Sequence, residues 1–359
     1  MQHRQPPLTR TPDSLIGRVV SDRYRIVRKL GEPGLAGLYL AEHLLVNRNV
    51  ALKIILPEVR RPDVLRTFLD DARTLARIGH ENIVEILCCG QSPEDFVFVA
   101  TEYLEGENLR ALLGREGPLP WARAKSIARQ IAAALDPVHE HRIFHRDLKP
   151  ENVFLTARNG TREFVKLLNF GVAQLTSAAL EEGETGSGRL CSAPPYVAPE
   201  LVQAQPVDHR ADIYSFGCML YEMLAGAPPF DGRSAVDVIS KHVQEPPLPL
   251  RQRRPDLDIA ADVDAAVLRA LEKDPERRYT TVAEMGAALE HCKSPNRFIA
   301  LATEGVAAGV AAARGDEHRP RAAKTRPLSS RRLRLAMATL IAALSGGALA
   351  AVYNALRGF

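Results

Sequence analysis

The sequence predicts an α+β protein with two unlike lobes, a small antiparallel sheet followed by a larger helical region, and a transmembrane helix near its C-terminus. Residues 24–55 contain the runs YRIVRKLG, GLYLAEH and VALKIIL, which are rich in strand-forming residues and separated by turn signals. Beyond residue 109, segments such as WARAKSIARQIAAALDPVHEH place apolar residues at helical spacing. Residues 335–353 contain no charged side chain, which is typical of a segment that crosses a bilayer.

The composition is that of a folded protein rather than a disordered one. The chain has 359 residues, of which 46% are hydrophobic and 25% charged, and its net charge is only +4. This length allows about two ordinary domains, or one larger bilobal domain with appendages. The five cysteines form no CxxC spacing, so free thiols are expected rather than disulfides or a zinc site. The N-terminus lacks the apolar core of a signal peptide, which argues against export.

Changes in composition divide the chain into five segments. The folded part begins where strand patterns start at Tyr24 and ends where helical periodicity is lost after Cys292. The predicted segments are a flexible lead-in at 1–23, the folded domain at 24–292, a basic juxtamembrane linker at 293–334, a transmembrane helix at 335–353 and a short extracytoplasmic tail at 354–359.

The predicted transmembrane helix fits a bilayer in length and in flanking charge. Its 19 residues would extend about 28 Å as a helix, close to the thickness of the hydrocarbon core. Basic residues precede it and only Arg357 follows, so the positive-inside rule places the folded domain in the cytoplasm and the chain as a single-pass protein of the inner (cytoplasmic) membrane. A buried soluble helix is the alternative.

Two further features near the C-terminus have both a functional and an ordinary interpretation. Ala343, Gly347 and Ala351 form a ridge of small residues that could pack two helices into a homodimer, or could simply be small residues in a weakly apolar anchor. Eight basic residues lie between Arg314 and Arg334, and a solvated linker explains them better than membrane-surface or nucleic-acid attraction. We expect no nucleic-acid partner.

Several short motifs follow one another along the folded part. They are LGEPGLAGLY, VALK, HRDLKPEN, NFG, APE and ADIYSFG. Taken singly, each has an ordinary explanation: a glycine-rich turn is more often a hairpin than a phosphate cradle, and Lys53 could be a solvated strand residue. Their joint occurrence in this order at workable separations is very improbable by chance.

The motifs resemble those of the eukaryotic-like (Hanks-type) serine/threonine protein kinases, found in bacteria as membrane receptors, from about Tyr24 to Cys292. The resemblance implies the bilobal protein-kinase fold, with one helix in the small lobe. It also implies ATP-dependent transfer of a phosphoryl group to a protein substrate, with Mg²⁺ as the cofactor and Mn²⁺ as an alternative ion. The lysine at position 149 is typical of enzymes that modify Ser or Thr rather than Tyr.

The resemblance assigns roles to individual residues. Asp147 would accept the substrate hydroxyl proton and Lys149 would steady the transferring phosphoryl group. Lys53 would contact the α- and β-phosphates and pair with Asp71, which lies on the apolar stripe of a helix beginning near Pro62 and therefore needs a buried partner. The other assigned residues are Asn152 and Asn169 at the metal, Leu30, Gly31, Gly34, Leu38 and Ala51 around the nucleotide, Glu102 and Leu104 at the adenine behind a small Thr101, and the structural residues Glu200, Asp212 and Arg278.

Five residues depart from the family pattern. Asn169 replaces the aspartate that binds the metal bridging the β- and γ-phosphates, and hard Mg²⁺ prefers carboxylate oxygens to amide oxygens. Pro33 and Ala36 replace glycines of the phosphate loop, which should lower nucleotide affinity. Asp71 is one methylene shorter than the usual glutamate, and Ala193 lacks the hydroxyl of the usual threonine.

These departures leave two hypotheses open. One is a slow, membrane-anchored Ser/Thr kinase in which Arg146 meets a phosphorylated activation segment, with Thr176, Ser177, Thr185 and Ser187 as candidate phosphorylation sites. The other is a catalytically dead pseudokinase that uses the same fold as a membrane-tethered signalling or docking module.

Overall fold

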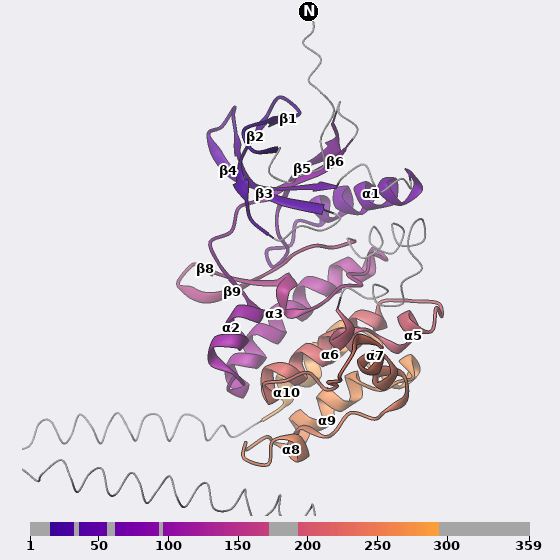
Figure 1. Ribbon diagram of the computed structural model, residues 1–359. Helices are drawn as coiled ribbons and strands as arrows, with labels where there is room; N and C mark the ends of the chain where they lie inside the picture. Colours follow the sequence, from indigo (N-terminus) through magenta and orange to yellow (C-terminus); the bar gives the residue numbers. More distant parts are fainter. Residues whose placement is uncertain (1–14, 32–35, 56–61, 93–95, 172–192, 294–359) are drawn as a thin grey trace, which may run out of the picture. The chain divides into compact units, whose positions relative to one another are not determined.

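A computed structural model describes residues 15–31, 36–55, 62–92, 96–171 and 193–293, all within one compact unit. The predicted bilobal kinase fold is confirmed: an antiparallel sheet forms the N-lobe and helices dominate the C-lobe (Figure 1). The predicted transmembrane helix, linker and phosphorylation sites lie outside the described residues, as do Pro33 and Gly34. Among the helices of the described residues, none is long and apolar enough to span a bilayer.

The N-lobe sheet holds six antiparallel strands in the order β1-β2-β3-β4-β6-β5. Its register places Lys53 of β4 opposite Leu38 of β3 and Val99 of β6. Because side chains alternate between the faces of a sheet, a slip of one residue would turn Lys53 to the other face. The strands are β1 (Val19–Val20), β2 (Tyr24–Lys29), β3 (Ala36–His43), β4 (Arg48–Ile55), β5 (Ile86–Gln91) and β6 (Val97–Glu102).

A single long helix, α1 (Pro62–Ile78), packs on the N-lobe sheet, as the helical spacing of its apolar residues predicts. Its buried side chains are Phe68, Ala72 and Leu75, while Asp71 is only partly buried. Phe68 packs with Val97 and Val99 of β6. The apolar face of α1 therefore fixes the helix beside the strands that carry Lys53 and the interlobe connection.

The C-lobe is built around α6 (Arg210–Ala225), whose residues from Ala211 to Ala225 are all buried. A helix buried on every side belongs at the centre of a lobe, and its neighbours carry one-sided apolar faces. The other helices are α2 (Leu109–Glu116), α3 (Trp121–Glu140), α5 (Pro199–Val202), α7 (Ala235–Gln244), α8 (Leu250–Arg253), α9 (Ala261–Ala270) and α10 (Val282–His291), with 3-10 turns η2 (Pro150–Asn152), η3 (Pro194–Tyr196) and η4 (Pro275–Arg277).

A small antiparallel sheet carries two of the predicted motifs to the edge of the C-lobe. Its strands are β7 (Gly106–Asn108), β8 (Val153–Arg158) and β9 (Thr161–Leu167). Asn152 directly precedes β8, and Asn169 follows β9 by two residues. Because β8 and β9 pair with Val153 opposite Leu167, the two motifs meet at the same end of this hairpin.

His242 on α7 is a fully buried histidine that should make stability depend on pH. Burial and the nearby Lys273 ammonium lower the pKa of His242 to about 3, whereas an unfolded histidine titrates near 6.5. Between these values the unfolded chain binds a proton that the folded chain does not, so stability falls as pH falls below about 6.5, by about 1.4 kcal/mol per pH unit.

We therefore expect the free energy of unfolding to fall more steeply between pH 6.5 and 5 in the native chain than in His242→Asn, which can keep a polar contact with Tyr214. Urea denaturation at several pH values measures this difference. The exposed His141→Asn is the matched control and should keep the native slope. Equal slopes for the native chain and His242→Asn would contradict the prediction.

Candidate active site

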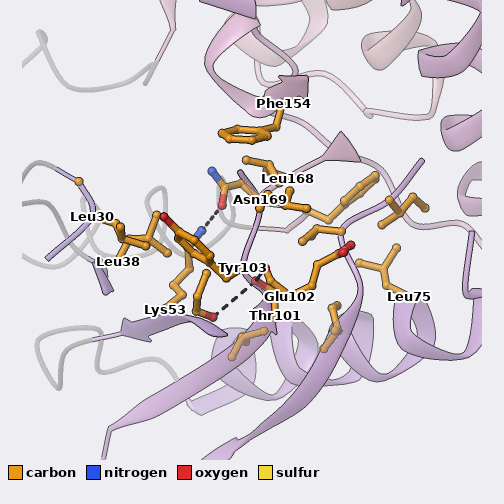
Figure 2. Close-up of a pocket in the computed structure, with 18 of the residues that line it drawn as sticks. Leu30, Leu38, Lys53, Leu75, Thr101, Glu102, Tyr103, Phe154, Leu168 and Asn169 are labelled. Atoms are coloured by element: carbon orange, nitrogen blue, oxygen red, sulfur yellow. Dashed lines mark hydrogen bonds between the residues drawn. The ribbon is translucent and has the colours of Figure 1, made fainter. Parts of the chain in front are cut away.

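A cavity of about 470 Å³ lies between the lobes and is lined by residues of both (Figure 2). Of the residues predicted to surround the nucleotide, Leu30, Gly31, Leu38, Ala51, Lys53, Glu102 and Leu104 line it, and so does Asn169. Sequence reasoning missed Phe154 and Leu168, which add apolar surface from the C-lobe. Their positions next to Asn152 and Asn169 in sequence are the signal that could have found them.

The walls of the cavity suit a flat, largely apolar ring with a few polar groups at its edge. Leu30, Leu38 and Ala51 contribute aliphatic carbon from the N-lobe, and Phe154 and Leu168 do so from the C-lobe. The small side chain of Thr101 keeps the interior end open, and its hydroxyl lies 3.3 Å from the carbonyl oxygen of Glu102.

The connection between the lobes is held by a mostly buried ion pair. The Glu102 carboxylate accepts a hydrogen bond from the Glu85 amide at 2.9 Å and pairs with Lys166 Nζ at 2.6 Å. Lys166 also donates to the Ile83 carbonyl at 3.2 Å. The Glu102 side chain is thus used in contacts within the protein. The Leu104 backbone makes no hydrogen bond within the described part of the chain, so it can hydrogen bond to a ligand.

Asn169 lies at the centre of a hydrogen-bond chain that crosses the site. Its Oδ1 accepts a hydrogen bond from Lys53 Nζ, and its Nδ2 donates to Asn152 Oδ1 at 2.7 Å. Asn152 Nδ2 in turn donates to the backbone oxygen of Asp147 at 2.6 Å and to its Oδ2 at 3.1 Å. Lys149 Nζ completes the chain, 2.7 Å from Asp147 Oδ2. The structure therefore brings together all the predicted catalytic and metal-site residues.

Both amide orientations in this chain follow from the hydrogen-bonding capacity of their neighbours. An ammonium only donates, so Asn169 must turn its oxygen toward Lys53 and its N–H₂ toward Asn152. An ionised carboxylate only accepts, so Asn152 must turn its N–H₂ toward Asp147. An aspartate at position 169 could not make the contact with Asn152, because its carboxylate has no proton to donate.

The Asn169 backbone adopts a conformation that most side chains avoid. Its φ of 65° is in the left-handed region, where asparagine is tolerated better than most residues, and Gly171 follows with a φ of 73°. Phe170 between them is buried and packs on His145, with ring centroids 4.5 Å apart. This packing holds the Asn169 side chain toward the cavity.

Lys53 has no carboxylate within ion-pair distance among the described residues. Its ammonium contacts the neutral amide of Asn169, and desolvation lowers its pKa to about 8, although Asp147 opposes this shift. A cation in this state should attract an anion that enters the cavity, since the anion would supply the missing charge.

The predicted pairing of Lys53 with Asp71 was wrong for this structure. No ion pair joins the two, because Lys53 contacts Asn169. Asp71 instead lies beside Gly171, and a β-carbon added to Gly171 would be 3.7 Å from Asp71 Oδ2. Burial raises the pKa of Asp71, while the Arg146 guanidinium acts in the opposite direction. The physical reason is side-chain length, because aspartate is one methylene shorter than glutamate. Lys53 hydrogen bonds to Asn169 instead.

The residues present could hold a divalent cation, but only weakly. Asn152 and Asn169 offer neutral carbonyl oxygens, and each oxygen already accepts a hydrogen bond. Hard Mg²⁺ favours charged oxygens, and among the described residues no group of three or more His, Cys, Asp or Glu side chains could hold a metal. A cation here would have to displace the Asn169–Asn152 hydrogen bond.

Asp212 holds the backbone of the catalytic loop, as the resemblance implies. Its carboxylate accepts hydrogen bonds from the amides of His145 and Arg146, both at 2.8 Å, and contacts His139 Nε2 at 2.8 Å. These contacts lower the pKa of Asp212 against its desolvation, and Arg146 is held at a left-handed φ of 61°. The loop is thus fixed at the two residues that directly precede Asp147.

Glu200 and Arg278 form the buried ion pair that was predicted as structural. Arg278 Nη1 and Nη2 donate to the two Glu200 oxygens at 2.7 and 2.8 Å. Its remaining donors reach the carbonyl oxygens of Glu272, Arg210 and Lys273. All five guanidinium N–H groups are therefore satisfied in a residue that is 2% exposed.

A second charged cluster, which sequence reasoning missed, joins the catalytic loop to the helical core. Arg110 of α2 donates to Glu151 Oε1 at 2.9 Å and to Glu222 Oε1 at 2.5 Å, and it also contacts the Tyr196 hydroxyl. Tyr196 donates to Glu222 Oε2 at 2.5 Å. One arginine thus connects η2, η3 and α6.

Replacing Arg110 with Met should lower the free energy of unfolding by about 2 kcal/mol, because the nearly buried Glu222 carboxylate loses its cation. Arg115→Met on the same helix removes a surface arginine that pairs with Glu107 and Glu116 near the solvent, and should destabilise the chain much less than Arg110→Met. Urea denaturation compares the two variants. Equal losses would show that the Arg110 cluster adds no more than a surface pair.

Ala193, another of the departures, directly precedes η3 and packs partly buried against the C-lobe core. Its methyl group offers no hydrogen bond to the catalytic loop. Gly37 of the glycine-rich segment has a packing role, because a β-carbon there would overlap the buried Tyr39 ring.

Comparison with known proteins gives a consistent result. The family model described as protein kinase domain matches residues 24–292. Serine/threonine-protein kinase pkn3 of Myxococcus xanthus is 34% identical over 286 residues, which cover 78% of this chain and 52% of the relative. Serine/threonine-protein kinase PknB of Mycobacterium tuberculosis is 37% identical over 276 residues, covering 75% of this chain and 43% of the relative. The chain thus spans about half the length of these curated relatives.

Solved structures agree on the fold. The crystal structure of the Mycobacterium tuberculosis PknI kinase domain is 28% identical, with a TM-score of 0.59, and the match covers 76% of this chain and 96% of that one. A crystal structure of Rad53 in complex with AMP-PNP has a TM-score of 0.61 at 24% identity, covering 75% of this chain and 64% of that one, and supports the fold alone.

Proposed function

Because the chain belongs to the protein kinase family, we propose that it is a serine/threonine protein kinase that transfers the γ-phosphate of ATP to a protein hydroxyl at a low rate. The observation that carries this proposal is the hydrogen-bond chain that joins Asp147 and Lys149, through Asn152, to Asn169 and Lys53, which both line the interlobe cavity. A carboxylate base and two ammonium groups are what phosphoryl transfer requires from the protein itself.

The arrangement supports a specific role for each group. Asp147 is oriented by Asn152 and Lys149, so its carboxylate is positioned to accept the proton of an incoming hydroxyl. Lys149 neutralises charge on the γ-phosphoryl group during transfer, and Lys53 binds the α- and β-phosphates. Mg²⁺, held by Asn152 and Asn169, would neutralise further charge on the β- and γ-phosphates when bound.

The low rate follows from the metal site. The site offers the cation two amide oxygens, where the family pattern offers one amide and one carboxylate. The cation must also compete with the Asn169–Asn152 hydrogen bond. A loss of about 4 kcal/mol in transition-state stabilisation would slow turnover about a thousandfold. Mn²⁺, which accepts nitrogen and oxygen ligands more readily, should support the reaction better than Mg²⁺.

Two observations favour a second candidate function, a pseudokinase that acts as a docking module. The metal-site side chains bind each other, and Lys53 lacks the carboxylate partner from α1 that the family usually provides. Such a protein would keep the bilobal surface for a protein partner without transferring phosphate.

We extend the proposal to the segments outside the described residues. Residues 335–353 would anchor the chain in the inner membrane with the kinase domain in the cytoplasm, and small residues on that helix could pair two copies. Thr176, Ser177, Thr185 or Ser187 would receive autophosphorylation. Membrane fractionation, crosslinking and mass spectrometry test these three points separately.

The test of the proposed function is a phosphotransfer assay of the purified chain with ATP and either Mg²⁺ or Mn²⁺. Autophosphorylation that disappears in Asp147→Asn, with unchanged thermal unfolding of the variant, supports the enzyme. The absence of transfer with both ions supports the pseudokinase.

A further inference from the structure

Five polar side chains across the candidate site form a continuous hydrogen-bond chain, in which both amide oxygens already accept a hydrogen bond. Lys53 donates to Asn169, Asn169 to Asn152, and Asn152 to Asp147, which Lys149 meets from the other side. Every member of the chain makes a hydrogen bond of the correct direction. Each of the five side chains therefore has a partner within the protein.

The same chain carries excess positive charge. Lys53 and Lys149 contribute two ammonium groups, while Asp147 is the one carboxylate among the five side chains that form it. An aspartate at position 169 would supply a second carboxylate and neutralise Lys53. With Asn169 in place, the Lys53 ammonium lines the cavity beside a neutral amide and suits a polyanion.

An aspartate would also create a conflict that Asn169 avoids. The Asn169 Nδ2 group lies 2.7 Å from Asn152 Oδ1 and donates a hydrogen bond to it. A carboxylate oxygen of an aspartate in the same place would face the Asn152 oxygen with no proton between the two acceptors. A divalent cation between the two oxygens resolves such a conflict. A site with aspartate therefore depends on the cation, whereas a site with asparagine does not.

From this geometry we propose that the chain binds a nucleoside triphosphate without a divalent cation, and that Asn169 is the residue responsible. The proposal rests on the nucleotide-binding half of the proposed function. Lys53 takes the charge-neutralising role toward the phosphates that a cation otherwise shares. Nucleotide occupancy then becomes independent of the catalytic metal, so the site can respond to ATP without turning it over.

Isothermal titration of the full chain with ATP, in excess EDTA and in MgCl₂, tests the proposal. We expect the dissociation constant of the native chain to differ by less than about threefold between the two buffers. Asn169→Asp should bind at least about tenfold more weakly in EDTA than in MgCl₂. Lys53→Met should lose binding in both buffers.

Asn159→Asp is the matched control, because it adds the same charge at an exposed turn between β8 and β9 and should behave as the native chain does. Thermal unfolding of each variant without nucleotide establishes that it is folded. A native chain that loses tenfold or more in affinity on removal of Mg²⁺, or an Asn169→Asp variant with the native buffer dependence, would overturn the proposal.

Phosphotransfer by the same preparations separates this inference from the proposed function. Transfer with Mg²⁺ but no ATP binding in EDTA refutes the inference and leaves the kinase intact. ATP binding in EDTA with no transfer in Mg²⁺ or Mn²⁺ refutes the kinase and leaves the inference intact.

Discussion

Asn169→Asp should raise the rate of phosphoryl transfer in Mg²⁺ by about a thousandfold, equivalent to about 4 kcal/mol of transition-state stabilisation. The variant supplies a charged oxygen for the metal and removes the N–H₂ group that now occupies Asn152 Oδ1. The other groups of the reaction, Asp147, Lys149 and Lys53, are already connected to Asn169 by the hydrogen-bond chain of the site. Initial rates of autophosphorylation in Mg²⁺ measure the effect.

The gain should be smaller in Mn²⁺, because the native site accepts that ion better. The double variant Asn169→Asp with Asp147→Asn is the control and should be as inactive as Asp147→Asn alone. No gain from Asn169→Asp in either ion would mean that the glycine-rich loop or the Ala193 segment also limits turnover, and the pseudokinase would then be the better description.

Arg278→Met should lower the free energy of unfolding by about 3–5 kcal/mol. The substitution leaves the Glu200 carboxylate, which is 3% exposed, without a cation, and it removes the donors to three backbone carbonyl groups. Desolvation of an unpaired charge makes such a loss much larger than that of a surface ion pair. Urea denaturation followed by circular dichroism measures the change.

The neighbouring Arg277→Met is the matched control, because Arg277 is exposed and its contact with Glu272 is 3.8 Å long. It should change stability by about 0.5 kcal/mol or less. The double variant Arg278→Met with Glu200→Leu should be more stable than Arg278→Met alone, since no buried charge remains. A small loss in Arg278→Met would show that the pair orients the C-lobe without stabilising it.

Much of the candidate site could be predicted from local sequence. The HRDLKPEN motif fixes Asp147, Lys149 and Asn152 within one short loop, so their proximity follows from spacing alone. The alternation in VALK placed Lys53 on a strand, and the register of β4 with β3 and β6 agrees. The Glu200–Arg278 pair was implied by the resemblance rather than by spacing, because 78 residues separate its members.

Other contacts could not be predicted, because they depend on side-chain reach across separate elements. Asp71 lies on the apolar stripe of its helix as expected, yet its partner depends on how closely α1 approaches β4. The Arg110 cluster joins residues from four elements, and no local pattern marks it. The need for glycine at position 37 was likewise not predicted, because it depends on where the Tyr39 ring lies: a β-carbon on Gly37 would overlap that ring.

The sequence by itself determined the family, the two-lobed fold and the loss of a carboxylate at position 169. These properties depend on the type and order of the residues, so they can be read from local periodicity and motif spacing. Only the tertiary structure decided what the Asn169 amide does. Lys53 and Asn169 are 116 positions apart, and their contact exists because the two lobes meet at one cavity and the donors and acceptors there must pair.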